Sequence, residues 1–177
     1  GSDNASVGEV VDYYKSAQIQ NTLERAIFID LNDNNKWIFD GKSVIYYETG
    51  QKEKEYYYVN GKLEGIHKTF YKSGKLKAVT NYRNGIAHGE YNSFYESGAN
   101  YIRFNYVNGL IEGDWIAYHE SGAIEQTVEW VNGKKEGLLK DYKISGKLNF
   151  VQKYENGLKV SDESFYESGK TKNIWSY

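Results

Sequence analysis

The sequence contains no cysteine, no proline and no methionine in its 177 residues. Without cysteine, the chain has neither disulfides nor thiolate chemistry, and its composition does not indicate a redox compartment. No apolar run approaches the roughly 20 residues that a membrane-spanning helix requires. A net charge of −2 offers no basic patch for nucleic acid or for an anionic membrane surface. We therefore expect no nucleic-acid partner and no membrane insertion by this segment.

Because the sequence contains no methionine, we expect that the chain does not begin at a start codon. Gly1-Ser2 resembles a cloning remnant, so we expect that a signal or anchor segment has been removed. On that ground alone an exported or envelope location is favoured over the cytoplasm, and the residues themselves leave the compartment unknown.

Aromatic residues and glycine are abundant. There are 18 Tyr, 7 Phe, 4 Trp and 18 Gly. Aromatic side chains favour pleated, half-buried surfaces, and glycine favours tight turns. The composition predicts an all-β fold.

Fifteen of the 18 glycines fall on a lattice with a period of 24 residues. They form three series, which are Gly41, Gly65, Gly89, Gly113 and Gly137; Gly50, Gly74, Gly98, Gly122 and Gly146; and Gly61, Gly85, Gly109, Gly133 and Gly157. A fixed period of this length indicates a repeat architecture, in which each unit packs on its neighbours. The sequence predicts an elongated array of antiparallel β-hairpins, forming a single twisted meander sheet.

The lattice also predicts the organisation of the chain. Residues 1–24 are expected to be a partly disordered lead-in. Within it, the pattern of Val7–Gln20 is compatible with a short helix or an extended segment, and we favour the extended segment. A repeat array follows over residues 25–177. It comprises an N-terminal cap hairpin at 25–40, five full units over 41–160, and a C-terminal cap at 161–177 that is one residue short. The Asn32–Asn35 run is the expected turn of the first hairpin.

Two aromatic columns run through the units. The first is Tyr46, Phe70, Phe94, Tyr118 and Tyr142, and the second is Tyr58, Tyr82, Tyr106, Trp130 and Tyr154. A two-residue hairpin loop would place the columns on opposite faces, whereas a three-residue loop such as Glu96-Ser97-Gly98 would place them on one face. We expect the three-residue loop, and hence one face.

A further set of tyrosines then faces away from the two columns. It includes Tyr47, Tyr71, Tyr95 and Tyr166, and we call these four the tyrosine strip. Tyrosine supplies contact area at low entropic cost, so the strip is a candidate surface for a protein partner. The alternative is structural, with the rings lying along the sheet and stiffening it.

No catalytic or metal-binding constellation stands out. The histidines, His67, His88 and His119, occupy three different positions of the repeat and lack a nucleophile at a recognisable spacing. The Asp30–Asn34 segment lacks the glycine and distal glutamate of a calcium loop, and Ser168-Gly169-Lys170-Thr171 lacks the first glycine of a phosphate-binding loop. We expect a protein that is not an enzyme and has no cofactor.

The units resemble the bacterial variant of the MORN repeat. The residues that carry the resemblance are Gly89, Phe94-Tyr95, Ser97-Gly98, Tyr106, Asn108-Gly109 and Gly113, and equivalent residues stand in the unit before. The match extends from Ile27 to Tyr177. Ser161 departs from it, because a glycine is expected there.

The resemblance implies an interaction scaffold with a protein partner and no catalytic residues. Proteins with these units include YwqK-type antitoxins, which implies neutralisation of a toxin by direct contact. Others are exported or lipid-anchored envelope proteins, and that alternative stays open, as does self-association.

Overall fold

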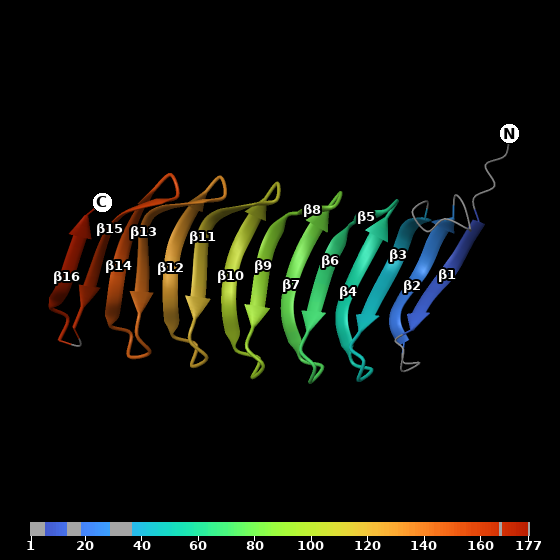
Figure 1. The fold of residues 1–177 in the computed structure, drawn as a ribbon, viewed down its shortest axis with the longest axis horizontal. Helices are drawn as coiled ribbons and strands as arrows, with labels where there is room; N and C mark the ends of the chain where they lie inside the picture. The colour runs from blue at the N-terminus through green and yellow to red at the C-terminus, as the bar shows by residue number, and fades with distance from the viewer. Residues whose placement is uncertain (1–5, 14–18, 29–36, 167, 177) are drawn as a thin grey trace. The chain divides into compact units, whose positions relative to one another are not determined.

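The computed structural model describes residues 6–13, 19–28, 37–166 and 168–176 (Figure 1). Every regular element in these residues is a β-strand, which confirms the predicted all-β fold. The chain divides into two compact units, unit 1 (Gly1–Ile86) and unit 2 (Ala87–Tyr177).

In unit 1 the strands follow one another in an antiparallel meander, with the short β5 paired to β4 beside the main path. The strands are β1 (Ser6–Tyr13), β2 (Ile19–Phe28), β3 (Trp37–Tyr46), β4 (Lys52–Val59), β5 (Lys62–Leu63), β6 (Gly65–Phe70) and β7 (Leu76–Arg83). The two-residue β8 (Ile86–Ala87) lies at the boundary between the units.

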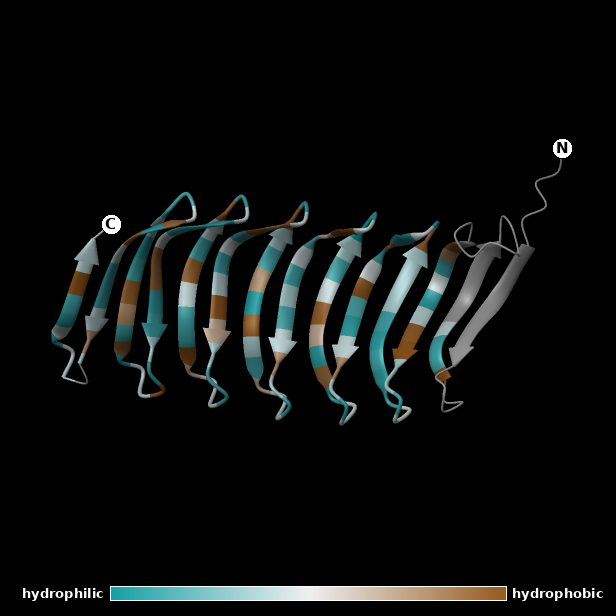
Figure 2. Cartoon of the chain, in the orientation of Figure 1, coloured by the Kyte–Doolittle hydropathy of each residue, from teal (hydrophilic) through white to brown (hydrophobic). Residues whose placement is uncertain are grey.

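Unit 2 is likewise an antiparallel meander, in the order of its strands along the chain. These are β9 (Gly89–Phe94), β10 (Asn100–Val107), β11 (Leu110–Tyr118), β12 (Ile124–Val131), β13 (Lys134–Tyr142), β14 (Leu148–Glu155), β15 (Leu158–Phe165) and β16 (Thr171–Ser176). Polar and apolar residues alternate along many of them, as expected for strands with two different faces (Figure 2).

The N-terminal region contains more sheet than the sequence indicated. Residues 6–13, expected in the lead-in, form β1, which pairs with β2 in register Val7 to Ile27. The expected first hairpin is the pairing of β2 with β3, Phe28 to Trp37. Its turn at 29–36 and the polar residues at 1–5 lie outside the described residues.

The Ser-Gly turns have the predicted three-residue loop. In one of them, Tyr95 N donates to Ala99 O at 2.8 Å and Gly98 N donates to Tyr95 O at 2.9 Å. Gly98 has a φ of 96°, which a residue with a Cβ adopts only with strain.

The predicted alignment of the two aromatic columns on one face is wrong. A further bulge follows the loop, because Phe94 pairs with Asn100 while Ser93 pairs with Ile102, which leaves Tyr101 unpaired on β10. Ile102 lies on the same face as Phe104 and Tyr106, and so does its partner Ser93. Phe94 is adjacent to Ser93, and adjacent residues on a strand point to opposite faces. By this register Phe94 lies on the opposite face from Tyr106. The bulge recurs in the other hairpins, between Ile45 and Tyr46 for example, and sequence spacing gives no sign of it.

The C-terminal cap keeps its pairing although it is one residue short. In the preceding units, two additional residues lie at the start of the unit, where the pairing moves from Asn105–Glu112 to Arg103–Ile116. In the last unit it moves from Tyr154–Lys159 to Lys153–Ser161, with one additional residue. The C-terminal cap therefore has one residue fewer in this bulge, and the rest of β15 keeps the pairing of the other units.

The buried residues of unit 2 gather on one face. Ser93, Phe104, Ala117, Val128 and Leu139 are each no more than 8% exposed, and the register places all of them on the face of Tyr106. We call the face of each unit that carries the second column its aromatic face.

Candidate partner-binding surface

The Asn-Gly turns lie together at one end of the strands in each unit, and we call this side the Asn-Gly edge. The main chain bonds each turn to the repeat before it. Asn132 and Gly133 have φ values of 52° and 74°, the left-handed pair of a type I′ turn. The glycine amide of each turn donates to a carbonyl 22 residues earlier, as Gly133 N does to Ile111 O at 3.0 Å. The same bond joins Gly61 to Phe39, Gly85 to Leu63, Gly109 to Ala87 and Gly157 to Lys135, at 2.7 to 2.9 Å.

A carboxylate adds a second bond at four of these turns. The amide of the turn asparagine donates to an acidic side chain 20 residues earlier, as Asn132 N does to Glu112 Oε2 at 2.7 Å. Equivalent bonds join Asn60 to Asp40, Asn84 to Glu64 and Asn156 to Glu136, at 3.2, 2.7 and 2.8 Å. Sequence reasoning missed this role, although an acid recurs one residue before the unit-opening glycine.

The fifth turn departs from this pattern. His88 stands where the other repeats carry the acid. Within the part of the chain that the structure describes, the amide of Asn108 has no side-chain acceptor equivalent to Glu112. Its glycine still donates to the main chain, from Gly109 N to Ala87 O at 2.9 Å.

The opposite edge, at the Ser-Gly turns, carries the predicted tyrosine strip. The Tyr47 hydroxyl donates to Phe70 O at 2.8 Å, and the Tyr95 hydroxyl donates to Tyr118 O at 2.7 Å. Each side chain therefore reaches the turn of the following repeat. Burial, with a contribution from Glu53, raises the pKa of the Tyr47 phenol.

The strip is not continuous in unit 2. The positions after Tyr95 carry His119 and Lys143, so Tyr95 and Tyr166 are not neighbours. His119 takes over the tyrosine's bond, with Nε2 donating to Tyr142 O at 2.8 Å. Tyr166 is 53% exposed, and the Lys172 ammonium lies 5.8 Å from its ring.

In the hairpins of Tyr71 and Tyr95, the unpaired bulge residue lies against the tyrosine of the strip. The rings of Tyr101 and Tyr95 are 4.8 Å apart, and the Lys77 ammonium lies 5.5 Å from the Tyr71 ring. Tyr101 is 40% exposed. It extends the accessible aromatic surface at this edge, and without knowledge of the bulge the sequence could not assign it there.

The aromatic faces carry clusters of rings in contact. In unit 2, Tyr91 stacks on Phe104 at 4.5 Å, and Tyr106 meets both rings edge-on. Further along, the Lys135 ammonium lies 6.0 Å from the Trp130 ring and 5.1 Å from the Tyr154 ring. Such contacts stabilise a sheet on which the described residues of the unit place no second layer.

His67 is part of the cluster in unit 1. Its ring stacks on Tyr56 at 4.3 Å and lies 5.8 Å from Tyr82. Nε2 is buried and has no hydrogen-bond partner among the described residues. Burial, with a smaller contribution from Lys54, lowers the pKa of the imidazole. His67 is thus a packing residue of the aromatic face.

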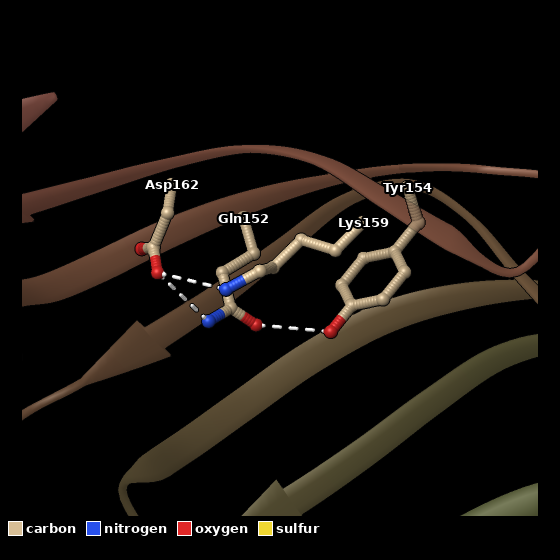
Figure 3. Close-up of polar contacts among 4 residues, drawn as sticks. All are labelled: Gln152, Tyr154, Lys159 and Asp162. Carbon is tan, nitrogen blue, oxygen red and sulfur yellow. Dashed lines mark hydrogen bonds and ion pairs between the residues drawn. The ribbon is translucent and has the colours of Figure 1, made fainter. Parts of the chain in front are cut away.

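A polar network closes the aromatic face of unit 2 across β14 and β15 (Figure 3). The Tyr154 hydroxyl donates to Gln152 Oε1 at 3.0 Å, and Gln152 Nε2 donates to Asp162 Oδ2 at 3.3 Å. Lys159 Nζ lies 3.2 Å from the same Asp162 oxygen. Each of these four side chains therefore has a polar partner within the sheet.

The other face of unit 2 is charged, and among its shallow hollows are two that charged residues line. One, of about 370 Å³, is lined by Glu90, Arg103 and Asp114, among others. The second, of about 320 Å³, is lined by Asp114, Glu129 and Lys140, among others. Asp114 pairs directly with Glu129, and like charges facing each other across strands are unfavourable.

Among the described residues, no group of three His, Asp or Glu side chains is placed to hold a metal ion. None of their elements is a helix long and apolar enough to cross a membrane.

A family described as MORN repeat variant matches this chain at residues 39–60, 63–84 and 111–132. Each matched stretch ends at the asparagine of an Asn-Gly turn, in phase with the 24-residue period. Repeats of this family commonly mediate interactions with proteins or membranes.

No curated protein matches the chain. Among solved structures, one similar chain comes from "Crystal structure of GtfA/B complex bound to UDP and GlcNAc". The two are 13% identical with a TM-score of 0.27, and the match covers 64% of this chain and 22% of that one. The chain thus spans less than a quarter of that chain's length, and so remote a likeness carries no argument about what this chain binds.

Proposed function

We propose that this chain is a non-enzymatic scaffold that binds a protein partner at its Ser-Gly edge. The observation that carries the proposal is the state of the tyrosines there. Tyr47 and Tyr95 are half-buried, and their hydroxyls are bonded to the next repeat. The rings are therefore held in place before any partner arrives, which lowers the entropy lost on binding.

Accessible aromatic area adjoins these fixed rings. Tyr101 packs on Tyr95 and is 40% exposed, and Tyr166 is 53% exposed at the end of unit 2. Tyrosine is enriched among the interface residues that contribute most of the binding free energy between proteins. The match to a repeat family that commonly mediates interactions with proteins or membranes supports the same proposal.

The finer hypothesis is an antitoxin-like role, in which the partner is a toxin neutralised by direct contact. It rests on the resemblance to bacterial YwqK-type proteins alone. Identification of the partner separates it from a structural role in the cell envelope.

The test is capture of a partner from a lysate of the source organism on the immobilised chain. Tyr101→Ser and Tyr166→Ser remove exposed rings at the Ser-Gly edge. Tyr57→Ser is the matched control, because Tyr57 is 48% exposed but pairs with Lys42 within the sheet. We expect one stoichiometric protein to be retained by the wild type and by Tyr57→Ser.

The same protein should be lost, or retained far less, by at least one of the two edge variants. Equal retention by all four proteins would show that the edge tyrosines are structural. Circular dichroism of each variant would confirm that the sheet is intact.

A further inference from the structure

The five Asn-Gly pairs are sites where a covalent modification of the chain is chemically accessible. In such a pair the glycine nitrogen attacks the asparagine Cγ, the side-chain nitrogen leaves as ammonia, and a cyclic imide forms. Water then opens the imide at one of its two carbonyls, giving aspartate or isoaspartate. The sum is one amide plus one water giving one carboxyl group plus one ammonia. Glycine favours the attack because it has no Cβ to obstruct the approach.

In this array the attacking nitrogen is engaged at every one of the five turns. Each glycine amide donates to a carbonyl of the preceding repeat, at 2.7 to 3.0 Å. Attack therefore requires the turn to open first and to break this bond. The rate at each site depends on the free energy of that local opening.

The five turns differ in whether a second hydrogen bond must break before the glycine nitrogen can attack. At Asn60, Asn84, Asn132 and Asn156 the turn also loses a bond from the asparagine amide to a carboxylate. The carboxylate is bonded to the asparagine amide, which adjoins the attacking glycine nitrogen in the chain. Its negative charge therefore opposes the loss of the glycine proton that the attack requires. At the turn of Asn108 and Gly109 the acid is replaced by His88, and neither effect operates.

We propose that Asn108 is a site of spontaneous deamidation and reacts before the other four asparagines. All five are exposed, so access of water does not distinguish them. Isoaspartate at 108 adds a methylene to the main chain and breaks the type I′ geometry of its turn. The hydrogen bond from Gly109 N to Ala87 O is then lost, and unit 2 has one bond fewer between an Asn-Gly turn and the preceding repeat.

The experiment is incubation of the whole purified chain at mildly alkaline pH, followed by peptide mapping with mass spectrometry. The five sites are compared within the same molecules. We expect Asn108 to deamidate roughly fivefold faster than Asn132, the factor that corresponds to one ordinary hydrogen bond, because the bond at Asn132 is exposed. An Asn108 that reacts no faster than the other four would overturn the proposal.

Three variants test the cause. His88→Glu supplies the missing carboxylate and should slow Asn108 to the rate of its neighbours, whereas His88→Gln should leave it fast. Glu112→Ala should accelerate Asn132. A His88→Gln protein slowed as much as His88→Glu would contradict the role of the carboxylate. If any variant loses its sheet by circular dichroism, the ranking of the five sites in the wild type still decides.

Discussion

At the Asn-Gly edge each turn is bonded to the repeat before it through main-chain amides, whereas at the Ser-Gly edge it is bonded to the repeat after it through a side chain. The main-chain bonds recur at all five Asn-Gly turns. The side-chain position instead varies along the array, with tyrosine at 47, 71 and 95, histidine at 119 and lysine at 143.

The difference shows which edge can change without loss of the fold. A main-chain bond needs only the correct backbone, so the Asn-Gly edge depends on two residues that accept the left-handed conformation. A side-chain bond needs only a donor of sufficient length. The Ser-Gly edge can therefore vary its side chains, as a surface that recognises a partner must.

The largest predicted difference between the edges is in their glycines. Gly133→Ala forces a Cβ into the left-handed conformation and places it 3.2 Å from Leu110 Cδ2. Gly98→Ala meets nothing within 4 Å. We expect Gly98→Ala to lower the free energy of unfolding by about 1–2 kcal/mol and Gly133→Ala by about 1 kcal/mol more, because Leu110 must move. Urea unfolding measures both, and equal losses would contradict the closer packing at the Asn-Gly edge.

The acidic bond is expected to come next. Glu112→Ala removes the acceptor of the Asn132 amide, and because that bond is exposed we expect a loss of about 1 kcal/mol. Glu96→Ala, an exposed acid in a Ser-Gly turn, is the control and should change the stability by less than about 0.5 kcal/mol. Similar losses in the two variants would show that the carboxylate of Glu112 does not support the turn.

At the Ser-Gly edge the matching change is Tyr95→Phe. It removes the hydroxyl bonded to Tyr118 O and keeps the ring, so we expect a loss of about 0.5–1 kcal/mol in unfolding free energy. Tyr101→Phe, at the neighbouring exposed ring, should have no measurable effect. Thermal unfolding compares the two variants, and equal melting temperatures would contradict a stabilising role for the Tyr95 hydroxyl.

A smaller effect is expected where histidine replaces tyrosine. His119→Tyr should preserve the bond to Tyr142 O and change the stability by no more than about 0.5 kcal/mol. His119→Leu should lose about 0.5–1 kcal/mol, because no donor remains. Equal stability of the tyrosine and leucine variants would show that the position contributes only packing.

The last prediction concerns the aromatic face between the edges. The folded-state pKa of His67 is lowered by burial, so below its usual value near 6.5 the unfolded chain binds a proton more readily than the folded one. Stability should therefore fall as the pH drops through the window between that value and the lowered pKa. His67→Phe should remove this part of the pH dependence, whereas His88→Phe at the edge should not. The comparison requires urea unfolding at several pH values, and an unchanged pH profile in His67→Phe would refute it.

Much of the fold follows from the sequence because turns have strict local requirements. The positions of Gly98 and of the Asn-Gly pairs give the hairpins and the three-residue loop directly. The bulge at Tyr101 could not be predicted, because a bulge is set by pairing with the neighbouring strand. That single residue places Phe94 and Tyr106 on opposite faces.

The candidate surface was only partly accessible to sequence reasoning. The position of Tyr95 beside the Ser-Gly turn follows from the repeat, but the target of its hydroxyl lies 23 residues away, on the next hairpin. The acid at Glu112 recurs with the period, yet its acceptor role appears only when turns of successive repeats are adjacent. Contacts between repeats are tertiary contacts. The period of the sequence therefore identifies the residues that recur in each repeat, but it does not identify the residues that they contact in the next one.

Amide hydrogen exchange at the turns, followed by NMR, tests most directly that the Asn-Gly edge is held by the preceding repeat. The amides of Gly109 and Gly133 should both be protected, since both donate to a carbonyl of the previous repeat. The amide of Asn132 should also be protected, and that of Asn108 should exchange much faster because it lacks a carboxylate acceptor. Equal exchange of Asn108 and Asn132, or free exchange of the two glycine amides, would contradict this account.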